Sequence, residues 1–323
     1  MTTIVTLAEL KNDAENFVTF KRAMGHRYQR GAYEIDRFLR FLEQRWNGKD
    51  GIPLADAISN WCGRLPGRKA ISLSGEFGVI RQFCLHRRRR DPASYVPEHA
   101  FAPVKESPFF PYIFSHEEVL RILAAASAYE GHFIWASMLR RLILVLYCTG
   151  LRLGEATRLK MEDVDLDRGT LLIRNSKRRT RIVPIRDDLM AELQLYLRDR
   201  NRLLSDLARG DPGTLFIREK GGPIDAHGAS VIIRKILRHL NIKPARGRVG
   251  PRPYEFRHAF AVHRLTAWAK EGVDIHAKLP FLSAYLGHQN IVGTEVYLKA
   301  TPRLLELAST RFEQHMRSAR QPR

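Results

Sequence analysis

Five prolines within a short stretch divide this 323-residue chain into two parts. They stand at positions 92, 97, 103, 108 and 111 of the segment DPASYVPEHAFAPVKESPFFPYIFS, residues 91–115. Proline lacks a backbone N–H and fixes φ, so a continuous helix cannot pass through this segment and an extended connector is favoured. A chain of this length also suits two cores better than one small core. We therefore predict a domain at 1–92, a linker at 93–114 and a second domain at 115–323.

The first domain is predicted to be helical. Four of its segments carry apolar residues at a spacing of three to four, which is the period of an amphipathic helix. Two breaks that contain glycine or proline separate consecutive segments: NGKDGIP lies between the second and third, and LPGRK lies between the third and fourth. The four segments are 7–24, 33–46, 53–65 and 74–90.

The second domain is predicted to be mainly α-helical with one β-hairpin. Ser115 followed by Glu118 is a capping-box pattern that marks a helix start. A mostly apolar helix is expected at 134–149, ending near Gly150. The runs TLLIR and RIVPI flank a short basic connection within GTLLIRNSKRRTRIVPI, which is typical of a hairpin. Further helices are expected at 187–205, 226–240, 257–272, 276–287 and 303–317.

The charge balance favours a polyanionic partner. The chain carries a formal net charge of +20, and nucleic acid is the first candidate for such an excess. Residues 1–100 hold 17 Lys/Arg against 11 Asp/Glu, and residues 101–323 hold 37 against 23, so both halves are positive. Two basic lobes joined by a stiff connector suit a clamp around a duplex.

The sequence favours a membrane or secreted protein less than a nucleic-acid-binding one. The longest apolar run, FIWASMLRRLILVLYCTG, is interrupted by Arg140 and Arg141 and is too short to span a bilayer. The start of the sequence shows no secretory signal pattern. Three scattered cysteines, at 62, 84 and 148, fit neither a metal site nor a disulfide framework, so we expect a reducing cytoplasm.

Strong cations and acid/base groups stand at four places where predicted elements end. Each has an ordinary reading when taken alone: a surface arginine, a solvated turn, a polar helix start, or a core tyrosine. The basic run HRRRR at 86–90 can likewise be a solvated patch or a set of contacts to a nucleic-acid backbone. The four places are TGLRLGEATRL with Arg152, NSKRRT with Lys177, PRPYEFRHAF with Tyr254, Arg257 and His258, and LGHQNIVGTEVYLK with His288 and Tyr297. In the first of them, we expect Gly154 to allow a tight turn.

Taken together and in this order, the motifs resemble the tyrosine recombinase/integrase family over about residues 115–300. The helical first domain also looks like the core-binding domain of that family. The resemblance implies that Arg152 and Arg257 are the two catalytic arginines, with Glu155 as the structural companion of the first. It implies that Lys177 is the hairpin lysine, that His288 fills the His/Trp position, and that Tyr297 is the nucleophile.

One position departs from the family pattern. The second box of the family usually reads His-x-x-Arg-His, whereas this chain has Tyr254-Glu255-Phe256-Arg257-His258. A phenol can hydrogen-bond to a phosphate oxygen, but with a pKa of about 10 it is a poor proton acceptor near neutral pH. The hairpin connection also looks about one residue shorter than in many relatives, so Arg178 and Arg179 stand close to the position assigned to Lys177.

The resemblance implies a site-specific recombinase that cuts and rejoins DNA through a 3′-phosphotyrosyl link, without metal, ATP or another cofactor. The expected partner is double-stranded DNA, with four copies of the chain on two DNA sites and with or without partner recombinases, in the cytoplasm at the nucleoid. Arg87, Arg88, Arg89, Arg90, Arg178 and Arg179 are candidate DNA contacts. A type IB topoisomerase and a DNA-binding accessory protein without chemistry are the alternatives, and Tyr254 gives the accessory protein some weight.

Overall fold

A computed structural model of the chain describes residues 4–46, 51–63, 70–98, 111–176, 179–247 and 249–298, with the side chains of 175, 176 and 179 excepted. The chain separates into two compact units, Met1–Phe109 and Phe110–Arg323. This division lies within the segment predicted to be the linker. Most of that segment is outside the described residues, so its predicted ends at 93 and 114 stay predictions.

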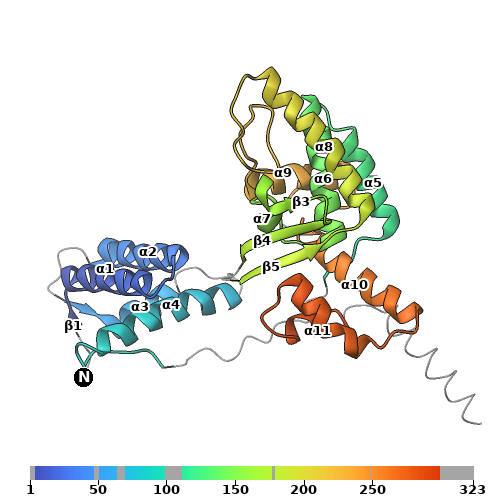
Figure 1. Ribbon diagram of the computed structural model, residues 1–323. Coiled ribbons are helices and arrows are strands. Elements are labelled where there is room, and N and C mark those ends of the chain that lie inside the picture. Colours follow the sequence, from blue (N-terminus) through green and yellow to red (C-terminus); the bar gives the residue numbers. More distant parts are fainter. Residues whose placement is uncertain are drawn as a thin grey trace, which may run out of the picture. The chain divides into compact units, whose positions relative to one another are not determined.

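In its described residues, unit 1 contains four helices and a pair of two-residue strands, and the helices are labelled in Figure 1. Thr6 accepts a hydrogen bond from the backbone N–H of Glu9, and the Glu9 carboxylate accepts one from the N–H of Thr6, so a capping box starts the first helix. The strand pair was not predicted, because two residues are too few to show an alternating pattern. The elements are β1 (Ile4–Val5), α1 (Leu7–Ala23), α2 (Gln29–Trp46), β2 (Ile52–Pro53), α3 (Leu54–Gly63) and α4 (Ala70–Arg88).

The helices of unit 1 share one apolar core. Leu10, Phe17, Phe38, Ile80 and Phe83 are almost completely buried in it. Ring pairs add directional contacts, since the centroids of Phe17 and Phe83 lie 5.9 Å apart. This core explains the helical spacing of apolar residues that the sequence shows over 1–92.

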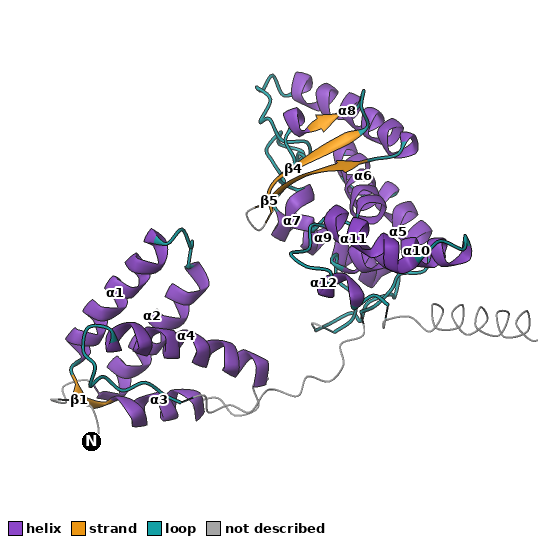
Figure 2. Cartoon of the chain, turned by 60° about the horizontal axis from the view of Figure 1, so that its bottom comes forward, coloured by secondary structure: helices purple, strands orange, loops and turns teal. Residues whose placement is uncertain are grey.

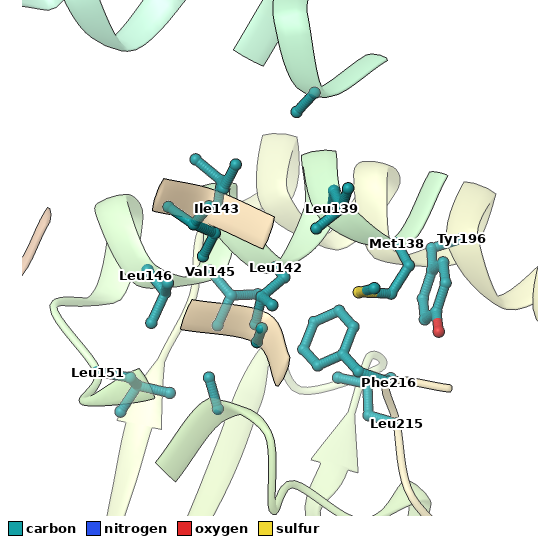
Figure 3. Close-up of a cluster of buried hydrophobic side chains, with 14 of the residues drawn as sticks. Met138, Leu139, Leu142, Ile143, Val145, Leu146, Leu151, Tyr196, Leu215 and Phe216 are labelled. Carbon is teal, nitrogen blue, oxygen red and sulfur yellow. The ribbon is translucent and has the colours of Figure 1, made fainter. Parts of the chain in front are cut away.

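Unit 2 is organised around the buried helix α6 (Phe133–Thr149), as predicted for 134–149. Its neighbours in the core are α5 (His116–Ser127) and α8 (Asp187–Asp206). The cluster drawn in Figure 3 joins the apolar side of α6 to Tyr196 of α8 and to Phe216 in the loop that follows. The capping box predicted from Ser115 and Glu118 is present at the start of α5.

Two arginines lie within the apolar sequence of α6 and are neutralised from α8. Arg140 Nη2 lies 2.8 Å from Glu192 Oε1, and Arg141 Nε lies 2.9 Å from Glu192 Oε2. The hydrogen bond from Arg140 is the main cause that lowers the pKa of Glu192, so this carboxylate stays charged between the two guanidinium groups. The ion pairs therefore let this apolar helix carry two arginines while it packs in the core of unit 2. No helix among the described ranges has the length and apolar character to cross a membrane.

The predicted hairpin is confirmed and forms part of a three-stranded antiparallel sheet. Strand β4 (Thr170–Ser176) pairs with β5 (Arg179–Pro184), with Leu171 opposite Val183. A short strand that was not predicted, β3 (Val164–Asp165), pairs with the other edge of β4. Figure 2 shows how little strand accompanies the helices, so the predicted class, mainly α with a small β-sheet, is confirmed.

Several of the remaining elements contain or border the candidate functional residues. The helices predicted at 187–205, 226–240, 257–272 and 276–287 all form, with each end within two residues of the prediction. The helix predicted at 303–317 lies outside the described residues. The elements are α7 (Leu153–Ala156), a 3-10 turn η1 (Met161–Asp163), α9 (Ala226–His239), α10 (Glu255–Lys270), α11 (Ile275–Leu286) and α12 (Val292–Glu295).

Candidate active site

Arg152 stands at the N-terminal end of α7 and is held by a buried carboxylate. Its Nη1 donates to Glu155 Oε1 at 2.7 Å, and its backbone N–H donates to Glu155 Oε2 at 3.1 Å. Glu155 also accepts a hydrogen bond from Arg181 Nη2 of β5 at 2.9 Å. One carboxylate therefore orients two guanidinium groups, and it ties the hairpin to the segment that carries Arg152.

The bend before Arg152 is made by Gly150. This residue ends α6 with φ of 62°, and a Cβ there would lie 2.6 Å from Phe260 Cδ1 and 2.7 Å from Leu286 Cδ2. Only glycine fits both the backbone conformation and the space. The prediction that Gly154 allows a tight turn is wrong, because Gly154 lies inside α7 and is not among the glycines with positive φ.

Arg257 connects two of the sequence motifs through its guanidinium group. Its Nη1 donates to the carbonyl of Gly150 and its Nη2 donates to the carbonyl of Leu286, both at 2.7 Å. The side chain is 1% exposed. Burial lowers the pKa of Arg257, and the nearby charge of Arg152 lowers it further, as expected for two cations held close together.

His288 follows the glycine that ends α11. Gly287 has φ of 69°, and a Cβ there would lie 2.7 Å from Arg181 Nη1, so the chain and the hairpin approach closely at this point. Arg181 Nε donates to the carbonyl of Tyr285 at 2.9 Å. The imidazole of His288 is oriented by Thr294, whose Oγ1 lies 2.7 Å from Nδ1.

Tyr297 lies buried among the same groups. Its ring centroid is 5.4 Å from that of His258 and 6.3 Å from that of His288, and the residue is 1% exposed. Burial raises the pKa of Tyr297 to about 12, while the charge of Arg257 acts in the opposite direction. The phenol is therefore protonated at neutral pH and needs a proton acceptor before it can act as a nucleophile.

Comparison with known proteins places this arrangement in a family. The profile of the Phage integrase family matches residues 113–303, which is more than half of the chain. The chain belongs to the phage integrase family.

Individual members of this family, the tyrosine recombinases, resemble the chain over most of its length. It is 28% identical over 312 residues to y4rB of Sinorhizobium fredii, a protein named as an integrase/recombinase, with 95% of this chain and 98% of that protein covered. It is 33% identical over 205 residues to the tyrosine recombinase XerC of Halalkalibacterium halodurans, covering 63% of this chain and 61% of XerC.

Solved structures show the same fold. The recombinase XerH, bound to a difH substrate in a post-cleavage complex, matches with a TM-score of 0.65 at 20% identity, covering 95% of this chain and 85% of XerH. The Tn1549 transposon integrase in complex with transposon right end DNA matches with a TM-score of 0.65 at 16% identity, covering 94% of this chain and 98% of that chain.

Of the residues that the tyrosine recombinase motifs single out, the structure brings Arg152, Arg257 and Tyr297 together, with His288 beside them. Tyr254 precedes the first residue of α10, is 42% exposed and lies with its ring centroid 4.8 Å from that of His258. Lys177 and Arg178 are outside the described residues. Arg179 is placed only by its backbone at the start of β5.

The basic run at 86–90 divides into one buried arginine and three exposed ones. Arg87 is 7% exposed, and its Nε donates to Asp13 of α1 at 2.7 Å. Arg88, Arg89 and Arg90 are exposed, with Arg89 stacked over Phe20. The prediction that all four contact DNA is therefore revised, because burial and an ion pair give Arg87 a structural position inside unit 1.

Two features of unit 2 have no clear signal in the sequence. Arg181 was not singled out, because it reads as one more cation of a basic hairpin. The second feature is a group of cations in unit 2, where the pKa of Lys243 is lowered first by burial and then by three arginines. These arginines are scattered between positions 234 and 252, so only the fold collects them: Arg234, Arg238 and Arg252.

Within the described parts of the chain, no group of three or more His, Cys, Asp or Glu side chains is placed to hold a metal ion. The groups that converge on Tyr297 are arginine and histidine side chains. Two guanidinium groups can bind an anion such as a phosphodiester through paired hydrogen bonds, since each remains charged and has several donors in one plane.

Proposed function

We propose that this tyrosine recombinase carries out site-specific strand cleavage and rejoining of double-stranded DNA, with Tyr297 as the nucleophile. The observation that carries the proposal is the position of Arg257. Its two hydrogen bonds to Gly150 and Leu286 bring the Arg152 segment and the His288–Tyr297 segment to one guanidinium group. Such a site can bind the phosphate and present a nucleophile to it without a metal ion or ATP.

The proposed reaction assigns a task to each residue. Tyr297 Oη attacks phosphorus, the 5′ oxygen leaves, and the 3′ phosphate stays bound to the tyrosine. Arg152 and Arg257 stabilise the charge that grows on the non-bridging oxygens. Lys177 donates the proton to the leaving oxygen, since an amine on a hairpin turn can reach in and its pKa shifts readily. His288 hydrogen-bonds to the phosphate or assists proton transfer.

Rejoining uses the same link in reverse. The phosphotyrosine retains the energy of the broken phosphodiester, so a free 5′ hydroxyl of a second DNA can attack it and release Tyr297. Integration or transposition of a mobile element at the nucleoid in the cytoplasm would follow from this exchange. The structures of XerH and of the Tn1549 integrase with their DNA substrates support the proposed partner.

We further propose that exchange takes place in a tetramer on two DNA sites, with residues 303–317 docking on a neighbouring copy. Unit 2 has an apolar pocket of about 270 Å³ whose lining includes Trp268, Phe281 and Tyr285, with Arg186 and Arg264 beside them. Residues 303–317, RLLELASTRFEQHMR, offer leucines, a phenylalanine and two glutamates, which complement that lining. We expect deletion of 303–323, or Phe281→Ser, to prevent pairing of two DNA sites, and unchanged pairing by native gel would contradict this role.

The deciding experiment is covalent trapping. A nicked suicide substrate carrying the ends of the encoding element is incubated with the wild-type chain and with Tyr297→Phe in the presence of a chelator. We expect a DNA adduct on a denaturing protein gel for the wild type alone. Tight DNA binding with no adduct would instead support the accessory protein, and supercoil relaxation without exchange between paired sites would support the topoisomerase.

A further inference from the structure

Glu255, a buried acid, follows Tyr254, the residue that stands where the family usually has the first histidine of the His-x-x-Arg-His box. Glu255 is the first residue of α10 and is 8% exposed. Its Oε2 lies 3.5 Å from Nε2 of His258, one turn further along the same helix. A carboxylate buried at the start of a helix and facing an imidazole needs a reason, because burial of an unneeded charge is unfavourable.

The imidazole of His258 links this acid to the nucleophile. Its ring meets the ring of Tyr297 edge to face, with centroids 5.4 Å apart, and the ring of Tyr254 in the same way at 4.8 Å. Tyr254 is exposed, whereas His258 and Tyr297 are both buried. The order from solvent inward is thus Tyr254, His258 and Tyr297, with Glu255 beside His258.

We propose that His258, oriented by Glu255, accepts the proton that Tyr297 loses when it attacks the scissile phosphate. The proposal rests on the function proposed above and supplies the acceptor that Tyr254 cannot provide. His258 is the proton acceptor, and Glu255 is a positioning residue that acts through it.

The proton balance of the step is simple. The Tyr297 Oη–H bond breaks as Oη bonds to phosphorus, and the proton passes to Nδ1 of the His258 imidazole, the ring nitrogen on the other side from Glu255. The proton on Nε2 of that imidazole moves to the Glu255 carboxylate, so His258 ends neutral. The 5′ oxygen leaves with a proton from Lys177. The 3.5 Å separation of Glu255 and His258 is longer than a hydrogen bond, and catalytic contacts of this kind shorten when substrate binds.

The ionisation of the two groups suits this role. Burial raises the pKa of Glu255 to about 7, with Arg252 opposing the shift. Burial, and then the charge of Arg257, lowers the pKa of His258 to about 4. Around neutral pH the imidazole is therefore neutral, and because it is a weak base it does not keep the proton but passes it to the Glu255 carboxylate, whose pKa is higher. The charged and titratable groups around the two residues and Tyr297 are Arg152, Glu155, Arg252, Tyr254, Arg257 and His288.

The test measures adduct formation with the suicide substrate at saturating DNA, from about pH 5.5 to 8.5. In the wild type, we expect the rate to fall about tenfold per pH unit below a pKa near 7. Below this pH Glu255 is already protonated, so it cannot accept the proton that leaves Nε2 of His258. We expect Glu255→Gln to lower the rate at high pH by about a hundredfold and to remove this pH dependence. Glu271→Gln, at the exposed end of the same helix, is the matched control and keeps the wild-type profile.

Adding Tyr254→His to Glu255→Gln supplies the imidazole that the family normally has at this position. We expect this second change to raise the rate at least about tenfold. A Glu255→Gln chain that keeps the wild-type rate and pH dependence would overturn the proposal while leaving the proposed function standing. A wild-type chain that forms no adduct would overturn the proposed function and this step with it.

A measurement on the free wild-type protein needs neither activity nor a variant. In ¹⁵N-labelled protein, we expect the Nε2 resonance of His258 to titrate with a midpoint near pH 7, as its neighbour Glu255 ionises. A resonance that does not change between about pH 6 and 8 would overturn the coupling of the two groups.

Discussion

Two buried arginines, Arg87 of unit 1 and Arg257 of unit 2, are held in different ways. In unit 1, the charge of Arg87 is neutralised by Asp13, just as the partly buried Arg37 contacts both Glu34 and Glu76. In unit 2, the hydrogen bonds of Arg257 go to two carbonyls, which orient the guanidinium without cancelling its charge. A buried arginine held by carboxylates has its charge neutralised within the fold, so removal of either partner leaves an uncompensated charge, whereas one held by carbonyls keeps its charge for an anionic ligand.

The largest effect is expected at Arg257. Arg257→Lys keeps a positive charge but cannot donate to both Gly150 and Leu286 while presenting a planar group to phosphate. We expect the rate of adduct formation to fall about a thousandfold, since one donor to a transition-state oxyanion contributes about two to three orders of magnitude. Single-turnover cleavage of the suicide substrate measures this rate. A lysine variant within tenfold of the wild type would show that the fork geometry is unimportant.

Glu155 tests the other side of the comparison, because in unit 2 it neutralises two cations, Arg152 and Arg181, as Asp13 neutralises Arg87 in unit 1. Glu155→Gln leaves Arg152 and Arg181 close together without a negative charge between them. We expect the free energy of unfolding of unit 2 to fall by about 3 kcal/mol, the effect of removing one partner of a buried ion pair. Urea denaturation followed by tryptophan fluorescence measures it, and an unchanged midpoint would contradict the assigned role.

The smallest effects separate neighbours in the basic run. Arg88→Gln removes an exposed cation, so we expect the slope of log K against log salt for DNA binding to lose about 0.9. Arg87→Gln should leave the slope unchanged and lower the stability of unit 1 by about 1–2 kcal/mol, because it leaves Asp13 without its main partner. Equal slopes for the Arg87 and Arg88 variants would remove the distinction between the two arginines.

Local sequence patterns were sufficient for most elements of the fold. The capping box at Ser115 and Glu118, the apolar period of α6 and the hairpin each depend on residues that are close in sequence, so they could be recognised without the fold. The short strands β1, β2 and β3 were missed, because a strand of two residues shows no alternating pattern. The turn assigned to Gly154 belongs to Gly150, whose need for glycine comes from Phe260 and Leu286, far along the chain.

The sequence by itself determined the family, the order of its motifs and the candidate nucleophile, because the spacing of these residue types can be recognised without knowledge of their contacts. The tertiary structure decided which arginines are neutralised by carboxylates and which keep their charge for an anionic ligand. Arg257 reaches Gly150 across 107 positions, and Arg87 reaches Asp13 across 74. Glu255 was not singled out from the sequence, and its connection to the site appears only where the fold places its neighbour His258 against Tyr297. Burial and partner choice depend on such distant contacts, and a one-dimensional pattern does not contain them.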